Sequence, residues 1–444
     1  MGNSVNQYIE LYKDNKELIN ANSAVALNAY RDEACAVLEK VGLKKSKDFS
    51  ATDPEELLAP DYSLNLARHN VPTDRNDLFT CGIPDLSTCV HYMVNEQYIG
   101  ETRKTGEDKG VFAGSLREFA DRNPELITRY YNQQAGKTGE SALNTMLSQD
   151  GFVLYVPDGV EVEKPLQLIS LLRSVDDFMA CQRLLIIIGE DAKASLLVCE
   201  HASDLADVKL LSLQTTEIFV GKNATFDLYS LEEHKENVIR LSETFVRQEE
   251  GSNAAIGSFT LTAGKTRNRV NIDLDGEHID TNLFGMVIAD GEQQVDNITY
   301  IDHKKSYCNS NELFKYVLDG EAKGSFIGRI HVAQGAIKTD AHQTDRNLCL
   351  TDKARMVARP ELEIYADDVK CSHGATVGQL DQNALFYMRT RGIPEAEARM
   401  LLMFAFMGDV IDNIRIEPLK DRLKHLVEKR FRGELTQCKN CKIK

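Results

Sequence analysis

The chain has 444 residues, of which 42% are hydrophobic and 27% charged, a composition that indicates a folded globular protein and excludes general disorder. Its formal net charge of −16, with lysine and arginine dispersed along the chain, argues against nucleic acid as a partner, because phosphate binding needs a basic surface. No apolar run approaches the ~18 residues that span a bilayer, and no signal peptide is evident, so we expect a cytoplasmic protein without membrane contact.

Residues 1–147 are predicted to form a mostly helical N-terminal region. Helical spacing of apolar residues covers 24–41 and 115–131, and in the second stretch Ser115 and Glu118 form a capping-box pattern. A strand is also expected near residues 91–98, so the region need not be wholly α-helical.

Residues 148–378 change to short β-branched and apolar runs, which predicts a β core. Polar turns that begin with glycine separate many of these runs, at Gly189, Gly221, Gly251, Gly276, Gly291 and Gly320. Such a quasi-repeat is typical of a solenoid, whose coils stack because none buries its apolar face alone, with glycine supplying a positive φ at the corner. We predict a parallel β-helix, with a β-sandwich as the competing architecture.

Residues 379–444 return to a helical period and predict a C-terminal helical domain with a short tail. One helix runs from Gln382 to Arg391 and is closed by Gly392, a second follows Pro394, and a third starts at Pro418.

The ten cysteines are scattered without the dense spacing of a disulfide scaffold, so we expect mostly buried, reduced thiols. In the tail, Cys438 and Cys441 have the C-x-x-C spacing of redox dithiols and of half a zinc site. No second such pair exists in the chain, so their role stays open.

The strongest candidate for a site of chemistry lies in the last strand-like segment of the β core. Residues i and i+2 of an extended chain point to the same side, so Cys371 and His373 are expected on one face. Asp367, Tyr365 and Glu363 would follow on that face. Together they offer soft, borderline and hard metal ligands. By spacing alone the pair supplies at most two of four ligands, so a buried thiol beside a hydrogen-bonded histidine is the competing interpretation.

Residues 361–378, which include Ser372-His373-Gly374-Ala375, resemble the C-terminal signature of the SufB/SufD family of the SUF iron–sulfur cluster assembly system, as do residues 382–392. SufB-type members usually have a Glu-His-Glu-Ala string here, so SufD-type members are the closer relatives. The resemblance is strongest over residues 311–411, weakens through the preceding coils and is poor over residues 1–147. It implies a right-handed parallel β-helix.

The resemblance also implies a function. Such a chain would be a non-catalytic scaffold subunit that pairs with a SufB-like paralogue, while a SufC-like ABC-type ATPase binds each of the two. A transient iron or iron–sulfur cluster would be shared with the partner chain. The matching residues are His373 first and Cys371 second, with Glu361, Glu363 and Asp367 as second-tier ligands.

The ATPase would dock on the C-terminal helices, whose candidate partner-binding residues are Phe386, Arg389, Arg391, Phe404 and Phe406. The chain has no phosphate loop of its own, so ATP hydrolysis is expected from that partner.

Two functions of other classes compete with the scaffold. A metal-free β-helix could act as a homodimeric interaction module, and a homodimer in isolation is compatible with either interpretation. Parallel β-helices also occur in carbohydrate-active enzymes, but this chain has no tryptophan for stacking on a sugar ring.

Overall fold

The computed structural model describes residues 3–43, 52–69, 71, 89–101, 109–203 and 207–434. The N-terminal helices are α1 (Asn3–Ala21), α2 (Val25–Asn28), α3 (Arg31–Val41), α4 (Pro54–Leu57), α5 (Leu116–Arg122), α6 (Pro124–Tyr130) and α7 (Gly139–Leu147). The C-terminal helices are α8 (Gln382–Thr390), α9 (Glu395–Asp412) and α10 (Glu417–Phe431). Within the described residues, no helix is both long enough and apolar enough to cross a membrane.

The strands form two sheets, which we call sheet A and sheet B. Sheet A contains β3 (Phe112–Ser115), β4 (Phe152–Val156), β6 (Phe178–Ile188), β8 (Leu210–Val220), β10 (Val238–Gln248), β12 (Lys265–Leu274), β14 (Gln294–His303), β16 (Lys323–Val332) and β18 (Arg355–Ile364). Sheet B contains β2 (Gln97–Glu101), β1 (Cys89–Val94), β5 (Leu166–Leu172), β7 (Lys193–Ala202), β9 (Thr225–Glu233), β11 (Asn253–Thr262), β13 (Asp280–Ala289), β15 (Asn309–Leu318), β17 (Asp340–Cys349) and β19 (Lys370–Gly378).

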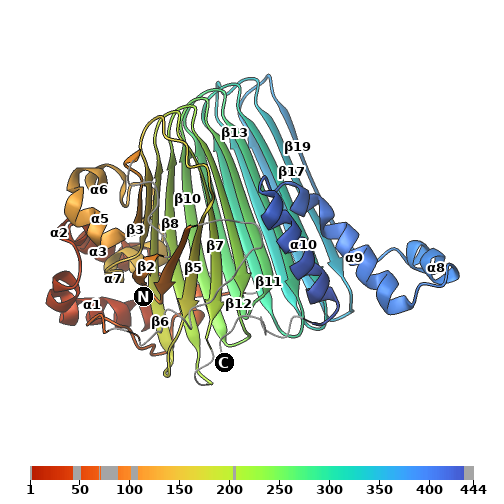
Figure 1. The fold of residues 1–444 in the computed structure, drawn as a ribbon, viewed down its shortest axis with the longest axis horizontal. Coiled ribbons are helices and arrows are strands. Elements are labelled where there is room, and N and C mark those ends of the chain that lie inside the picture. Colours follow the sequence, from red (N-terminus) through yellow and green to blue (C-terminus); the bar gives the residue numbers. More distant parts are fainter. Residues whose placement is uncertain are drawn as a thin grey trace.

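From β4 onward, each strand pairs in parallel with the strand two positions further along the chain, so the chain alternates between the sheets. This is a parallel β-solenoid of about 8 turns, as predicted, and the parallel pairing excludes the β-sandwich. Figure 1 shows the coils in chain order between the two groups of helices. Only the β1–β2 and β3–β4 pairs are antiparallel among the described strands.

Alternate side chains of every coil point between the two sheets, into a space that we call the solenoid interior. Stacked apolar side chains fill much of it, for example Leu166, Leu196, Leu228 and Ile256 along sheet B. Because each coil buries its inner face only against its neighbours, the stack is stable only as a whole.

The corner glycines serve two different purposes. Gly251 has a φ of 71°, as predicted for a corner. At the Gly221 corner the positive φ lies instead on Asn223, at 54°. A Cβ on Gly221 would lie 2.9 Å from the backbone nitrogen of Glu190 in the preceding coil, so this glycine permits close stacking of the corners. The expectation of a positive φ at every such glycine was therefore wrong.

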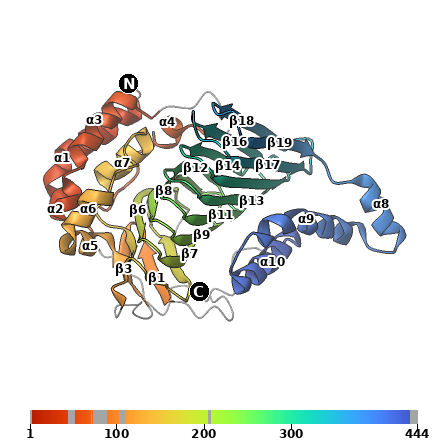
Figure 2. The same ribbon diagram turned by 90° about the horizontal axis from the view of Figure 1, so that it is seen from above.

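The N-terminal helices cover the outer face of sheet A (Figure 2). Helix α7 packs on β6, β8 and β10, where its Leu143 and Met146 join Leu213 in one apolar cluster, and α1 and α3 pack on α7. The stretch expected to be helical over residues 115–131 is divided at Asn123, since the residue before a proline is disfavoured in the α conformation.

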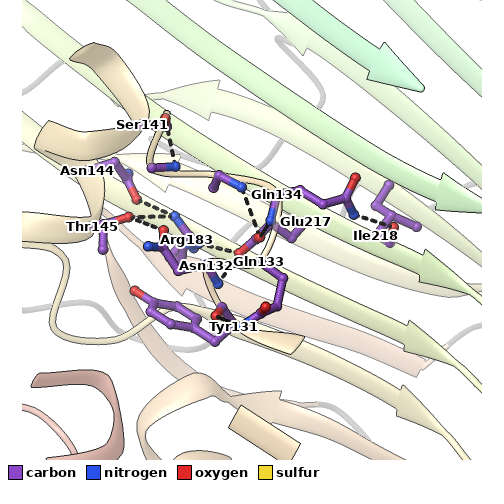
Figure 3. A network of polar contacts seen from close by, with 12 residues as sticks. Tyr131, Asn132, Gln133, Gln134, Ser141, Asn144, Thr145, Arg183, Glu217 and Ile218 are labelled. Atoms are coloured by element: carbon purple, nitrogen blue, oxygen red, sulfur yellow. Dashed lines mark hydrogen bonds and ion pairs between the residues drawn. The ribbon is translucent and has the colours of Figure 1, made fainter. Parts of the chain in front are cut away.

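A buried ion pair joins this helical region to sheet A (Figure 3). Arg183 of β6 donates to the carboxylate of Glu217 on β8, and both side chains are 0% exposed. Glu217 also accepts from the backbone N–H groups of Asn132 at 2.7 Å, Gln134 at 2.9 Å and Ala135 at 3.1 Å. One carboxylate therefore holds the loop between α6 and α7 on the sheet.

The C-terminal helices lie on the other side of the solenoid. Helices α9 and α10 pack on the outer face of sheet B, where Met407 and Leu423 join Phe284 in an apolar cluster. Helix α8 ends as predicted at Gly392, whose φ is 86°. It buries only Leu385 and extends away from the solenoid (Figure 1).

Candidate functional site

The last coil of the solenoid ends in two edge strands, β18 and β19. In the described part of the chain each has a hydrogen-bonded neighbour on one side only. Strand β19 is exposed at every residue except Cys371, which is half-buried. A row of backbone groups is thus open to a further strand.

Cys371 and His373 continue two columns of interior side chains on β19. Cys371 lies opposite Ala341, and His373 lies opposite Gln343; both partners are buried residues of β17. The pair therefore shares one face of β19, as predicted, and this is the inner face at the open end of the solenoid. Ser372 points the other way, and its hydroxyl lies 2.6 Å from Nδ1 of His342.

The thiol of Cys371 packs against the apolar interior, and this burial raises its pKa. At neutral pH it is therefore a thiol and not a thiolate. A metal ion that displaced the proton would convert it into a ligand.

The expectation that Glu363 and Asp367 share this face was wrong. Strand β18 ends at Ile364, and the chain turns a corner before β19 begins at Lys370. Glu363 lies on the outer face of sheet A, where its carboxylate is 3.5 Å from Nε of Arg329. Asp367 is exposed in the corner itself. The alternation of a strand cannot be continued across such a corner.

Glu361 and Tyr365 are also separated from the pair. The carboxylate of Glu361 accepts from Nη2 of Arg329 at 2.7 Å on the outer face of sheet A. Tyr365 is 62% exposed and contacts the ring of His331. Of the predicted face, only Cys371 and His373 come together.

Two buried carboxyl groups lie behind His373 in the interior. In the next coil but one, Glu312 accepts from Nε2 of Gln343 at 2.5 Å, and Gln343 is the residue opposite His373. Asp345 lies further along β17 and accepts from Nδ2 of Asn347 at 2.7 Å. Burial raises the pKa of Glu312 and of Asp345 to about 7. The interior near the open end is thus polar and titrates near neutrality.

Because of these two carboxyl groups, we predict that the free energy of unfolding falls as the pH rises from about 4 to about 7. A carboxyl whose pKa is raised in the folded state stabilises the fold while protonated, and this contribution is lost between the unfolded pKa near 4 and the folded pKa near 7. At about 1.4 kcal/mol per pKa unit, Glu312→Gln should be more stable than the native chain by about 3 kcal/mol at pH 8 and unchanged at pH 4.

Urea unfolding across this pH range measures the difference. Glu163→Gln, at an exposed carboxyl, is the matched control and should leave the pH profile unchanged. A Glu312→Gln profile that runs parallel to the native one would show that Glu312 titrates normally.

Comparison with known families agrees with this architecture. A family model described as "SUF system FeS cluster assembly, SufBD core domain" matches residues 171–406, and "SufBD protein N-terminal region" matches residues 2–168. The chain belongs to the SufBD family. The second match extends to the N-terminal helices, where the resemblance read from the sequence alone is poor.

Several curated members of the SufBD family are similar to this chain. The "Iron-sulfur cluster assembly protein SufD" of Escherichia coli is 31% identical over 294 residues, which are 66% of this chain and 69% of that protein. The SufD of Bacillus subtilis is 29% identical over 336 residues, 73% and 75% of the two chains. An "Iron-sulfur cluster assembly SufBD family protein" of Synechocystis is 28% identical over 394 residues, 86% of each.

The predicted partner-binding residues of this SufBD chain divide into two groups. Phe386 on α8 is 68% exposed, and Arg389 and Arg391 are exposed beside it. Phe404 and Phe406 are half-buried on α9, where they pack against the cluster on sheet B. Only the first group presents a free surface within the described residues.

A second group of metal-type side chains lies at the opposite end of the SufBD solenoid, and the sequence interpretation missed it. Ligand atoms of Cys89, His91 and Glu101 all lie within 4.8 Å of one another. Burial lowers the pKa of His91 to about 4, so its imidazole is neutral at pH 7. The sequence does contain a signal for this group, namely the Cys-x-His spacing at residues 89–91, which is the same as the spacing at 371–373. The C-x-x-C residues Cys438 and Cys441 lie outside the described residues.

Proposed function

We propose that the chain is a non-catalytic scaffold subunit of the SUF iron–sulfur cluster assembly complex. It would pair with a SufB-like paralogue, bind a SufC-like ABC-type ATPase that supplies ATP hydrolysis, and work in the cytoplasm. Cys371 and His373 would contribute ligands to a transient iron or iron–sulfur cluster at the SufB interface.

The observation that carries the proposal is the position of Cys371 and His373 on an exposed edge strand. A thiol and an imidazole both bind iron, but two ligands hold a metal weakly. An incomplete ligand set at an open edge suits a centre that a second chain completes and that later releases its cluster. Glu363 and Asp367 remain second-tier candidates, because they lie on other faces of the last coil.

The end of the solenoid supports a partner of the same architecture. A solenoid needs a cap or a neighbour at its terminal coil, and among the described elements nothing caps β18 and β19. Exposed apolar side chains also lie here, with Tyr365 62% and Val377 52% exposed. A paralogue could extend both sheets across this end. A second copy of the chain could do the same, which is the metal-free alternative.

The proposal is tested by anaerobic affinity purification of the tagged chain from its native cytosol, with partner masses and stoichiometry read by mass spectrometry. We expect recovery of a SufB-like chain and of SufC-like ATPase. Recovery of this chain alone would favour the metal-free homodimeric module.

Helix α8 provides the candidate surface for the ATPase. It extends from the body and exposes Phe386 and Tyr387 to 68% and 59%, with Arg389 nearby. Exposed aromatic and arginine side chains are typical interface hot spots. We expect Phe386→Ala to weaken binding of the ATPase about 30-fold, corresponding to a hot spot of about 2 kcal/mol, in a calorimetric titration.

The control is Val25→Ala, since Val25 is 84% exposed on α2, far from α8 in the fold. This variant should bind as the native chain does. Equal affinities for Phe386→Ala and the native chain would exclude this face of α8 as the docking surface.

A further inference from the structure

We propose that Cys89, His91 and Glu101 form a second metal-binding site, at the N-terminal end of the solenoid, for a borderline divalent ion such as Zn²⁺ or Fe²⁺. The site is separate from Cys371 and His373, because β1 and β19 lie at opposite ends of the parallel strands of sheet B.

The hairpin of β1 and β2 brings the three side chains together. Cys89 and His91 are two residues apart on β1, and they lie opposite Leu166 and Leu168, which belong to the interior core. Both side chains therefore point into the solenoid interior. Glu101 is the cross-strand partner of His91 on β2, so its carboxylate reaches the same place.

The distances suit a metal ion after a small adjustment. The three ligand atoms lie within 4.8 Å of one another, whereas ligands of a tetrahedral Zn²⁺ with bonds of 2.0–2.3 Å are about 3.3–3.8 Å apart. Nδ1 of His91 and a carboxylate oxygen of Glu101 are already 3.5 Å apart, and the Glu101 side chain, which is 26% exposed, has room to rotate.

The surroundings make this cluster unusual for packing alone. Met93, Leu166 and Leu168 around it are buried and apolar, and the ring of Phe152 is 5.4 Å from the imidazole of His91. Burying polar groups in such a place is costly unless they are satisfied. Two polar groups lie at Nδ1 of His91, the Tyr98 hydroxyl at 3.0 Å and the Glu101 carboxylate at 3.5 Å, and a metal ion shared by His91 and Glu101 would replace the second of these contacts.

The ligand set selects the class of ion. One sulfur, one nitrogen and one carboxylate oxygen favour Zn²⁺, Fe²⁺ or Co²⁺ over the hard ions Mg²⁺ and Ca²⁺. Three protein ligands also leave a fourth position open, which is the arrangement of reactive metal sites, whereas structural zinc sites are closed by four ligands. The partial exposure of Glu101 gives the ion a route of entry.

Cobalt titration of the full chain under anaerobic conditions tests the site. The starting protein carries Cys371→Ser and His373→Ala, which remove the ligands at the other end, and Cys438→Ser and Cys441→Ser, which remove the C-x-x-C pair. We expect one equivalent of Co²⁺ with a thiolate-to-cobalt charge-transfer band in the near ultraviolet, displaced by Zn²⁺. Adding Cys89→Ser should abolish the band. A band that survives Cys89→Ser, or the absence of any band before it, would overturn the proposal.

Glu101→Gln keeps the proposal testable if Cys89→Ser does not fold, because Glu101 is partly exposed. We expect it to weaken Co²⁺ binding about tenfold or more, since even second-shell changes cost that much. Glu163→Gln is the matched control, an exposed carboxyl on another part of the surface that should leave the affinity unchanged. Equal affinities for the two variants would remove Glu101 from the site.

Discussion

Glu217→Ala is expected to destabilise the chain by about 3–5 kcal/mol, because it leaves the guanidinium of Arg183 buried without its counter-charge. The change also removes the acceptor of the backbone N–H groups of Asn132, Gln134 and Ala135. The remaining contacts of Arg183 are weaker, namely the Thr145 hydroxyl at 3.2 Å, Oδ1 of Asn144 at 3.5 Å and the ring of Tyr131 (Figure 3). Urea unfolding measures the loss in the free energy of unfolding, and hydrogen exchange of the β6 and β8 amides shows whether these strands are affected.

The double variant Arg183→Met with Glu217→Ala separates charge from packing. Removing both members of a buried ion pair avoids the unpaired charge, so the double variant should be more stable than Glu217→Ala alone. If Glu217→Ala costs less than about 1 kcal/mol, or the second change adds further destabilisation, the ion pair does not hold the loop between α6 and α7 on sheet A.

The parallel β-solenoid could be predicted from the sequence because its strands repeat. Turn-leading residues such as Gly221 and Gly251 returned at similar intervals, and the β runs between them matched coils that must stack. The structural role of each corner glycine could not be predicted. Whether a corner needs a positive φ or a close approach depends on the neighbouring coil, as the contact of Gly221 with Glu190 illustrates.

The pairing of Cys371 with His373 could be predicted because two residues of one strand keep a fixed relation. The placement of Glu363 could not, because the alternation was continued through the corner between Ile364 and Lys370. The polar residues Asp367 and Asp368 in that stretch are typical of a turn, and they indicate that the strand ends before them.

The buried carboxyl groups were also not predicted from the sequence, because their burial depends on the three-dimensional arrangement of the coils. Glu312, Asp345 and Glu217 all occur in strands, where a carboxylate is usually exposed. Their burial depends on which face of which sheet they occupy and on what covers that face. The pairing of Cys89 with His91 was missed because the strand expected at 91–98 began at His91, whereas β1 begins at Cys89.

His373→Ala is expected to lower the cluster content of the assembled complex about tenfold or more, since loss of a ligand should cost at least what a second-shell change costs. The side chain is exposed on an edge strand, so the same change should leave folding within about 0.5 kcal/mol of the native chain. Co-purification of the partners should also persist, because one imidazole is a small part of such an interface.

Ser372→Ala is the matched control. Ser372 is the neighbouring residue on β19, it is exposed, and its hydroxyl faces His342 on the opposite side of the strand. The complex with Ser372→Ala should contain as much cluster as the complex with the native chain. Cys371→Ser should lower the cluster content in the same direction as His373→Ala.

The most direct test of the scaffold with a shared metal centre is the iron and acid-labile sulfide content of the complex purified anaerobically with native, Ser372→Ala and His373→Ala chains. We predict full content for the first two and a severe loss for His373→Ala, at unchanged partner stoichiometry. Equal iron and sulfide in all three complexes would contradict a metal centre at Cys371 and His373.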